Sequence, residues 1–198
     1  MYSVIFVQAL AAAGNLTAHD DSALRFIATG GADVLVSVLS PCSSPETTIE
    51  YYRSPDSGFS IASSAANIVC NLSPNHATSL VVAGIIRPIL KTLSMALQIR
   101  GSLISVLAEP LCWSLEIMAQ ERRNRPFLIE AGAFFVLEVA WKLRRKGISG
   151  HARHALLLLD DSRKSEFEPS HARSNRIAIS VDGAPGTIIS RGRRLSRA

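Results

Sequence analysis

The sequence has few aromatic residues and no long apolar run. Aromatic residues make up 6% of the 198 positions, whereas Ala, Leu, Ile, Val and Ser are plentiful. Closely packed helices tolerate this composition better than a β-sandwich, whose strands favour aromatic and β-branched residues. No apolar run reaches the roughly 18–20 residues that a membrane-spanning helix needs, so we expect no membrane span.

Cysteines are also scarce, and their spacing matches no metal site. Cys42, Cys70 and Cys112 are widely separated, without a CxxC or Cys/His pattern. Cys70 and Cys112 lie in apolar helical runs, where cysteine behaves as a small hydrophobic residue. The N-terminal apolar stretch ends in a signal-like motif at 11–13 but lacks a basic segment before it. We therefore expect free thiols and a cytoplasmic or nuclear protein.

Side chains that could perform chemistry are present but not grouped along the sequence. The GAPG segment at 183–186 follows neither P-loop nor Rossmann spacing. His151 and His154 are three residues apart with no Cys or carboxylate cluster, so we expect solvated surface histidines. Three glutamates fall at an irregular helical spacing with no recognisable His or Cys partner: Glu109, Glu116 and Glu121. The sequence thus predicts a protein that is not an enzyme and binds no cofactor or metal.

Charge is distributed unevenly. Residues 142–198 hold 13 basic and 5 acidic side chains, whereas residues 1–141 carry a net charge of −3. The helical period is lost over 168–198, where Pro, Gly, Ser and Arg dominate, so we expect a disordered basic tail. Binding of nucleic acid or an acidic surface through this end is an alternative function, although aromatic residues do not alternate with the basic ones. Loss of salt-sensitive affinity on deleting 168–198 would support that alternative.

Three segments repeat one order of features: residues 8–40, 64–94 and 109–143. Each has a helix of small residues, a polar break, a short apolar helix closed by glycine, and another helix. The closing glycines are Gly31, Gly84 and Gly132, at turns that need a left-handed backbone. Because helices with several apolar faces cannot bury them within one unit, neighbouring units are expected to stack.

The predicted stack occupies residues 1–167. It begins with a helix over 2–17 and continues in repeats over about 20–73, 75–119 and 122–161. The Ser- and Pro-rich segment 41–59 is predicted to be an exposed loop, and a further helix is predicted over 151–167. A helix at the start of the chain would expose apolar surface that a preceding repeat normally covers, so we expect a longer solenoid or a partner to cover that end.

One segment, CWSLEIMAQERRNRPFLIEAGAFFVLEVAWKL at 112–143, carries a family resemblance. Trp113, Leu115, Met118 and Ala119 follow a Trp-x-Leu pattern that ends in a small residue, and Glu-Ala-Gly-Ala at 130–133 forms the next turn. These features resemble an armadillo repeat, as found in importin-alpha and beta-catenin. The resemblance implies an all-α fold: a right-handed armadillo-type superhelix of about three repeats.

The resemblance also implies a peptide-binding groove. In armadillo proteins the third helices line a concave face, and asparagines there hydrogen-bond the backbone of an extended peptide. The positions that match are Asn15, Asn67, Asn71, Trp113 and Ile117. As an alternative, these asparagines tie neighbouring repeats together.

The function that follows is a non-catalytic scaffold binding an extended segment of a protein partner. Importin-alpha repeats carry Trp and Asn together as W-x-x-x-N, whereas no repeat of this sequence has both. Aromatic walls for lysine side chains are therefore missing, which makes a nuclear-import cargo adaptor the less favoured alternative.

Overall fold

The computed structural model describes residues 2–40, 58–98 and 103–167, within one compact unit that spans 1–167. Every regular element in these ranges is a helix and none is a strand, which confirms the all-α prediction. Most of the predicted loop and the whole predicted tail lie outside the described residues. No single helix in these ranges is long and apolar enough to cross a membrane. Two bent helix pairs, 20–39 and 59–96, would meet that requirement by length and composition alone.

The described helices are of two kinds, long and short, and each long helix except the last is followed by one or more short ones. The long ones are α1 (Tyr2–Thr17), α5 (Gly58–Val82), α7 (Leu103–Gln120) and α10 (Lys146–Phe167). The shorter ones are α2 (Asp20–Ala28), α3 (Gly31–Leu39), α6 (Ile86–Ala96), η1 (Arg122–Asn124), α8 (Arg125–Glu130) and α9 (Ala133–Lys142). Helix α1 has the predicted bounds, whereas α10 begins five residues before the helix predicted from residue 151.

The polar break predicted after Asn71 is a kink inside α5 rather than a gap between two helices. His76 leaves the helical conformation, with φ −128° and ψ 18°. Pro74, two residues earlier, has no backbone N–H to donate to the preceding turn, which weakens the helix at this point. The Ser73 hydroxyl donates to the Val69 carbonyl oxygen at 2.7 Å, a bond to the preceding turn that often accompanies a bent helix. The segment after the kink is thus the short apolar helix that the sequence predicted.

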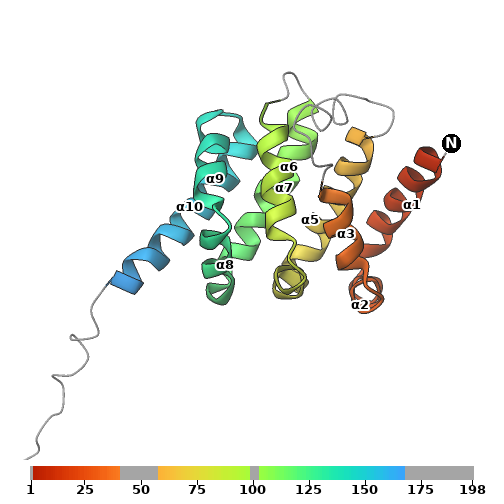
Figure 1. Ribbon diagram of the computed structural model, residues 1–198, viewed down its shortest axis with the longest axis horizontal. Coiled ribbons are helices and arrows are strands. Elements are labelled where there is room, and N and C mark those ends of the chain that lie inside the picture. The colour runs from red at the N-terminus through yellow and green to blue at the C-terminus, as the bar shows by residue number, and fades with distance from the viewer. Residues whose placement is uncertain (1, 41–57, 99–102, 168–198) are drawn as a thin grey trace, which may run out of the picture. The chain divides into compact units, whose positions relative to one another are not determined.

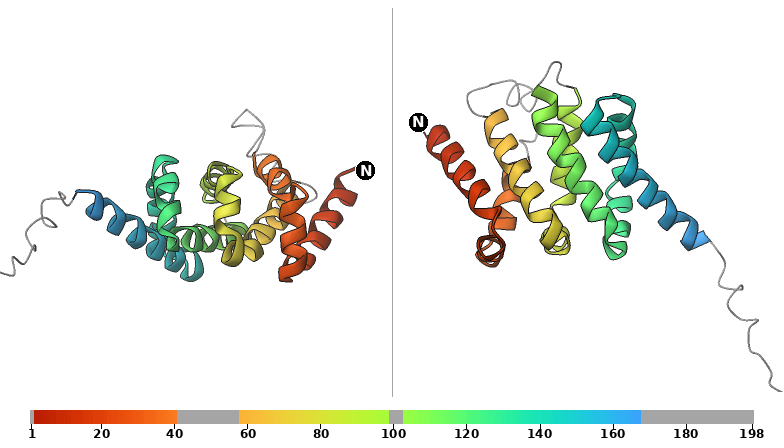
Figure 2. Two further views of the ribbon diagram at one scale, coloured as in Figure 1. Left: turned by 90° about the horizontal axis from the view of Figure 1, so that it is seen from below. Right: turned by 180° about the vertical axis from the view of Figure 1, so that it is seen from behind.

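The long helices form one layer of this unit, and α3, α6 and α9 form a second. Helix α1 packs against α5, α5 against α7, and α7 against α10, so the four long helices lie in chain order. Figure 2 (right panel) shows them side by side from red α1 to blue α10. Helices α3, α6 and α9 contact one another in the same order and face the viewer in Figure 1. The long helices therefore present one continuous surface of their own.

Glycines with positive φ stand between the short helices and the helices that follow. Gly30, Gly84 and Gly132 have φ values of 87°, 84° and 83°, in the left-handed region where a Cβ is penalised. The prediction of Gly31 as the first turn residue was wrong, because Gly30 has the positive φ. Gly31 instead begins α3, and its missing side chain makes room for the Phe26 ring, which an added Cβ would overlap.

The core consists of aliphatic side chains from both layers. Leu72 and Met118, which follow the candidate groove positions on α5 and α7, are completely buried. A buried hydrogen bond also links the α3–α6 layer, since the Thr92 hydroxyl donates to the Leu39 carbonyl oxygen at 2.9 Å. Apolar side chains are thus buried mainly by contacts between neighbouring helices.

Candidate functional site

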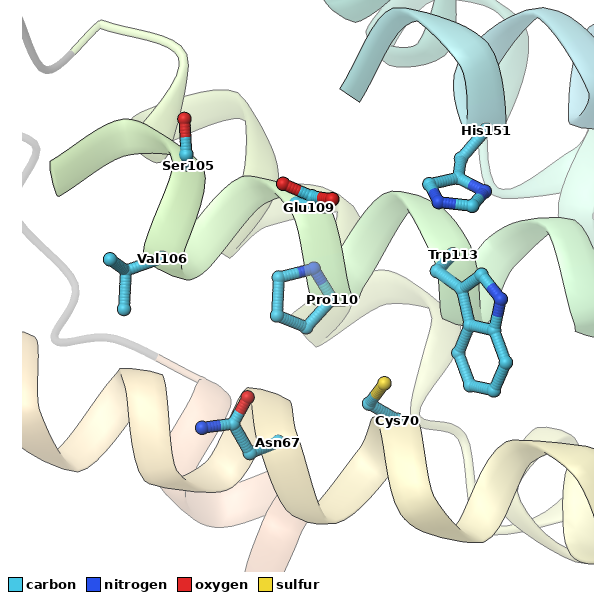
Figure 3. Close-up of a pocket in the computed structure, with 8 residues that line it drawn as sticks. All are labelled: Asn67, Cys70, Ser105, Val106, Glu109, Pro110, Trp113 and His151. Carbon is cyan, nitrogen blue, oxygen red and sulfur yellow. The ribbon is translucent and has the colours of Figure 1, made fainter. Parts of the chain in front are cut away.

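A shallow cavity of about 480 Å³ lies on the surface of the long-helix layer. Figure 3 shows side chains from α5 and α7 lining it, with one side chain from α10. Its lining residues are Asn67, Cys70, Ser105, Val106, Glu109, Pro110, Trp113 and His151. Two predicted groove residues from neighbouring helices, Asn67 and Trp113, are thereby brought to one site.

The helical repeat of α7 explains its share of the cavity. Val106, Pro110 and Trp113 are separated by four and three residues, which places them on one face of the helix. Pro110 lies inside α7, and the Ser114 hydroxyl donates to its carbonyl oxygen at 2.8 Å. The resulting surface is apolar along the middle of α7, with the half-buried indole of Trp113 at one end.

Asn71, one turn after Asn67, makes a contact between helices instead. Its Nδ2 donates to the carbonyl oxygen of Gly14 in α1 at 2.9 Å. Four residues further on, Asn75 Nδ2 donates to Oδ1 of Asp20, the first residue of α2, at 2.8 Å. Asn71 and Asn75 therefore join α5 to the preceding helices, as the alternative interpretation of the asparagines expects for Asn71.

The two remaining groove candidates are not among the residues that line the cavity. Asn15 is exposed near the C-terminal end of α1, next to the Gly14 carbonyl that Asn71 contacts. Ile117 is half-buried on α7, one turn beyond Trp113. Both remain on the long helices, so their part in a groove stays a prediction.

A polar cluster beside the cavity was missed from the sequence. Glu116 of α7 accepts from both histidines of α10: Oε2 lies 2.6 Å from His151 Nδ1, and Oε1 lies 3.2 Å from His154 Nδ1. The expectation that Glu116 has no His partner was therefore wrong. No sequence pattern signals it, because 35 and 38 residues separate the partners. Nevertheless, no group of three or more His, Cys, Asp or Glu in the described part of the chain is arranged to hold a metal ion.

Glu109 lies between the cavity and the start of α10. A Cβ added to Gly147, in the first turn of α10, would overlap the Glu109 carboxylate. The positive end of the α10 dipole favours a negative charge there. Burial, together with the charge of Glu109, raises the pKa of the Cys112 thiol to about 12. Glu109 thus places a carboxylate at the edge of the cavity, beside the start of α10.

The thiols should be poor nucleophiles in the folded protein. Burial alone raises the pKa of Cys70, and Cys112 is completely buried. Since the thiolate is the reactive form, we expect Cys112 to react with Ellman's reagent at neutral pH only after unfolding, and half-buried Cys70 to react slowly. The test is to count the thiols that react with and without guanidinium in two variants. Cys42→Ser retains Cys70 and Cys112, and Cys42→Ser/Cys70→Ser retains Cys112 alone. Rapid labelling of Cys112 in the native protein would contradict the burial of α7.

Comparisons with known proteins do not identify the chain: no family model matches it, and no curated protein gives a significant match. The long-helix surface is therefore the basis for a functional assignment. That surface combines an apolar strip with an amide, an indole and a carboxylate, and such a set suits binding.

Proposed function

We propose that this protein is a non-catalytic scaffold of the armadillo type, which binds an extended segment of a protein partner across its four long helices. The observation that carries the proposal is the cavity that α5 and α7 share, with Asn67 and Trp113 in its lining. The two layers, in which the long helices follow one another in chain order, support the solenoid interpretation. A cytoplasmic or nuclear location belongs to the same proposal, since its thiols favour a reducing compartment.

Side chains of the cavity can hold a peptide through both polar and apolar contacts. An amide side chain offers both a donor and an acceptor, so exposed Asn67 can pair with one peptide unit of an extended chain. The indole of Trp113 and the apolar strip of Val106 and Pro110 can cover an aliphatic side chain of the partner. Asn71 has a different task, because its Nδ2 already holds α1.

This division between the two asparagines gives a test. Chemical crosslinking with the full chain would first identify the partner segment, whose affinity is then measured for single alanine variants. Asn67→Ala should weaken binding by about 0.5–1.5 kcal/mol, because a ligand peptide group loses its partner. It should leave the melting temperature nearly unchanged, since Asn67 is exposed and alanine is the better helix former. Asn71→Ala should lower the melting temperature and leave the affinity of the folded protein nearly unchanged, since it removes the hydrogen bond to Gly14.

Gln98→Ala serves as the matched control, because Gln98 is an exposed amide next to α6, outside the long-helix layer. It should change neither affinity nor stability. If the parent and Asn67→Ala bound the crosslinked segment with equal affinity, the cavity would not be part of the binding surface. Loss of stability in Asn67→Ala would assign that residue to the fold as well.

A further inference from the structure

Helix α1 lies at one end of the row of long helices. It packs mainly against α5 and α2, and in the described part of the chain no other helix lies on its far side. Most of its described side chains are apolar, yet only Leu10 and Thr17 among them are buried. A contiguous exposed apolar face is the usual mark of a contact with another protein or with a membrane.

The exposed apolar residues of α1 form one stripe. Ile5, Ala9, Ala12 and Leu16 follow one another at intervals of four, three and four residues, which places them on one face of the helix. All of them are exposed, and the two large ones strongly so, since Ile5 is 66% and Leu16 is 59% exposed. Gly14, two residues from both Ala12 and Leu16, lies on the opposite face, where its carbonyl oxygen meets α5.

The order of residues in this stripe is the same in both directions: large, small, small, large. Suppose that two copies of α1 lie antiparallel about a two-fold axis between Ala9 and Ala12. Ile5 of each copy then meets Leu16 of the other, and Ala9 meets Ala12. A two-fold interface pairs one surface with itself, so it requires this kind of self-complementarity. The central alanines let the helix axes approach to about 8 Å, the lower end of the range for packed helices.

The charges and polar groups of α1 fit the same arrangement. A two-fold axis brings identical groups close together, which is unfavourable for charged side chains, and α1 has none. Antiparallel helices also place the positive end of each helix dipole beside the negative end of the other. Exposed Gln8 and Asn15 lie seven residues apart along one edge of the stripe, so Gln8 of each copy would face Asn15 of the other, amide to amide.

We propose that this protein forms a homodimer through the exposed stripe of α1, with the two helices antiparallel about a two-fold axis. The inference is independent of the peptide-binding function, because the cavity is lined from α5, α7 and α10. It places Asn15, a predicted groove residue, at the edge of an interface between copies. One helix from each copy covers less than the roughly 800 Å² per partner of a standard interface, so the dimer should form reversibly at micromolar concentration.

Sedimentation equilibrium of the full chain under reducing conditions tests the proposal. The mass should rise from that of one chain towards that of two as the concentration increases. Ala9→Arg puts a charge at the centre of the stripe and should raise the dissociation constant at least about a hundredfold, because the interface would bury that charge without a partner. Ala11→Arg is the matched control, because Ala11 is exposed on α1 but outside the stripe. It should dimerise like the parent.

A mixture of two variants tests the antiparallel register. Ala12→Glu should be as monomeric as Ala9→Arg when each is alone. An equimolar mixture should dimerise, because position 9 of one chain meets position 12 of the other and the two charges attract. Variants with a damaged fold would gain nothing from mixing, and circular dichroism checks that both remain helical. As a second readout, amide exchange in α1 of the parent should slow as its concentration rises.

A parent chain that stays monomeric throughout the micromolar range would overturn the proposal. So would an Ala9→Arg variant that dimerises like the parent, or a mixture that stays monomeric. Flotation with neutral phosphatidylcholine vesicles tests a membrane as the other occupant of the stripe. Vesicle binding by a monomeric parent and not by Ala9→Arg would overturn the dimer and assign α1 to a lipid surface.

Discussion

Replacing Arg125 by methionine should lower the free energy of unfolding by about 2–3 kcal/mol. The reason is that a buried carbonyl oxygen loses the charged side chain that donates a hydrogen bond to it. Arg125 is 5% exposed, and its Nε donates to the carbonyl oxygen of Ala119 near the end of α7 at 2.7 Å. Its Nη1 donates to the Ser162 hydroxyl of α10 at 3.2 Å. One side chain at the start of α8 therefore joins three helices, and methionine replaces its stem but none of its donors.

Arg123→Met is a matched control two residues away. Arg123 forms its ion pair with Glu121 at 3.8 Å on the surface, where its side chain is 70% exposed. Exposed pairs of this kind contribute little, so the melting temperature should change only slightly. Thermal melting of both variants by circular dichroism makes the comparison, and equal melting of Arg125→Met and Arg123→Met would show that the buried contacts do not hold α8.

Gly132→Val should cost about 1–3 kcal/mol, because a β-branched residue is strained at the φ of 83° found there. The strain is confined to the backbone: a Cβ at this position would meet no atom within 4 Å. For a unit of this size, each kcal/mol lowers the melting temperature by roughly 2–4 °C. Thermal melting would measure the loss, and the helical signal at low temperature should persist.

Gly150→Ala is the control, with the opposite expected sign. Gly150 lies inside α10 without positive φ, and an added Cβ there also meets open space. Alanine should therefore stabilise the helix by about 0.5–1 kcal/mol. If Gly132→Val melted at the parent temperature, the turn between α8 and α9 would not need its left-handed residue.

Local sequence signals predicted those parts of the fold that local physics decides. The helix over 2–17 follows from its run of small and apolar residues, and the turns at Gly84 and Gly132 from glycine's freedom at positive φ. At the doublet Gly30-Gly31 the local sequence predicts a glycine turn but does not show which of the two residues adopts positive φ. Either glycine can adopt the left-handed conformation; Gly30 does so, whereas Gly31 leaves room for the Phe26 ring, a contact that the doublet itself does not indicate.

The contacts of the candidate site could be predicted from local sequence signals even less than the turns. Asn67 and Asn71 are the same residue type one turn apart, and only the position of α1 gives Asn71 a carbonyl partner at Gly14. Likewise, Glu116 meets His151 because α7 packs against α10. Contacts of this kind depend on how helices distant in sequence are placed, so a helical period cannot predict them.

The order of the long helices has a consequence for how the unit opens. Among the described side chains of α1, only Leu10 and Thr17 are buried, whereas α7 is covered by α5 on one side and α10 on the other. Stability in a structure of neighbour contacts is a sum over adjacent elements, so the least covered helix opens at the lowest free energy. We therefore expect amide protons of α1 to exchange with deuterium through fraying of that helix alone, and those of α7 to exchange only when the whole unit unfolds. Fraying of α1 would therefore leave the cavity on α5 and α7 intact.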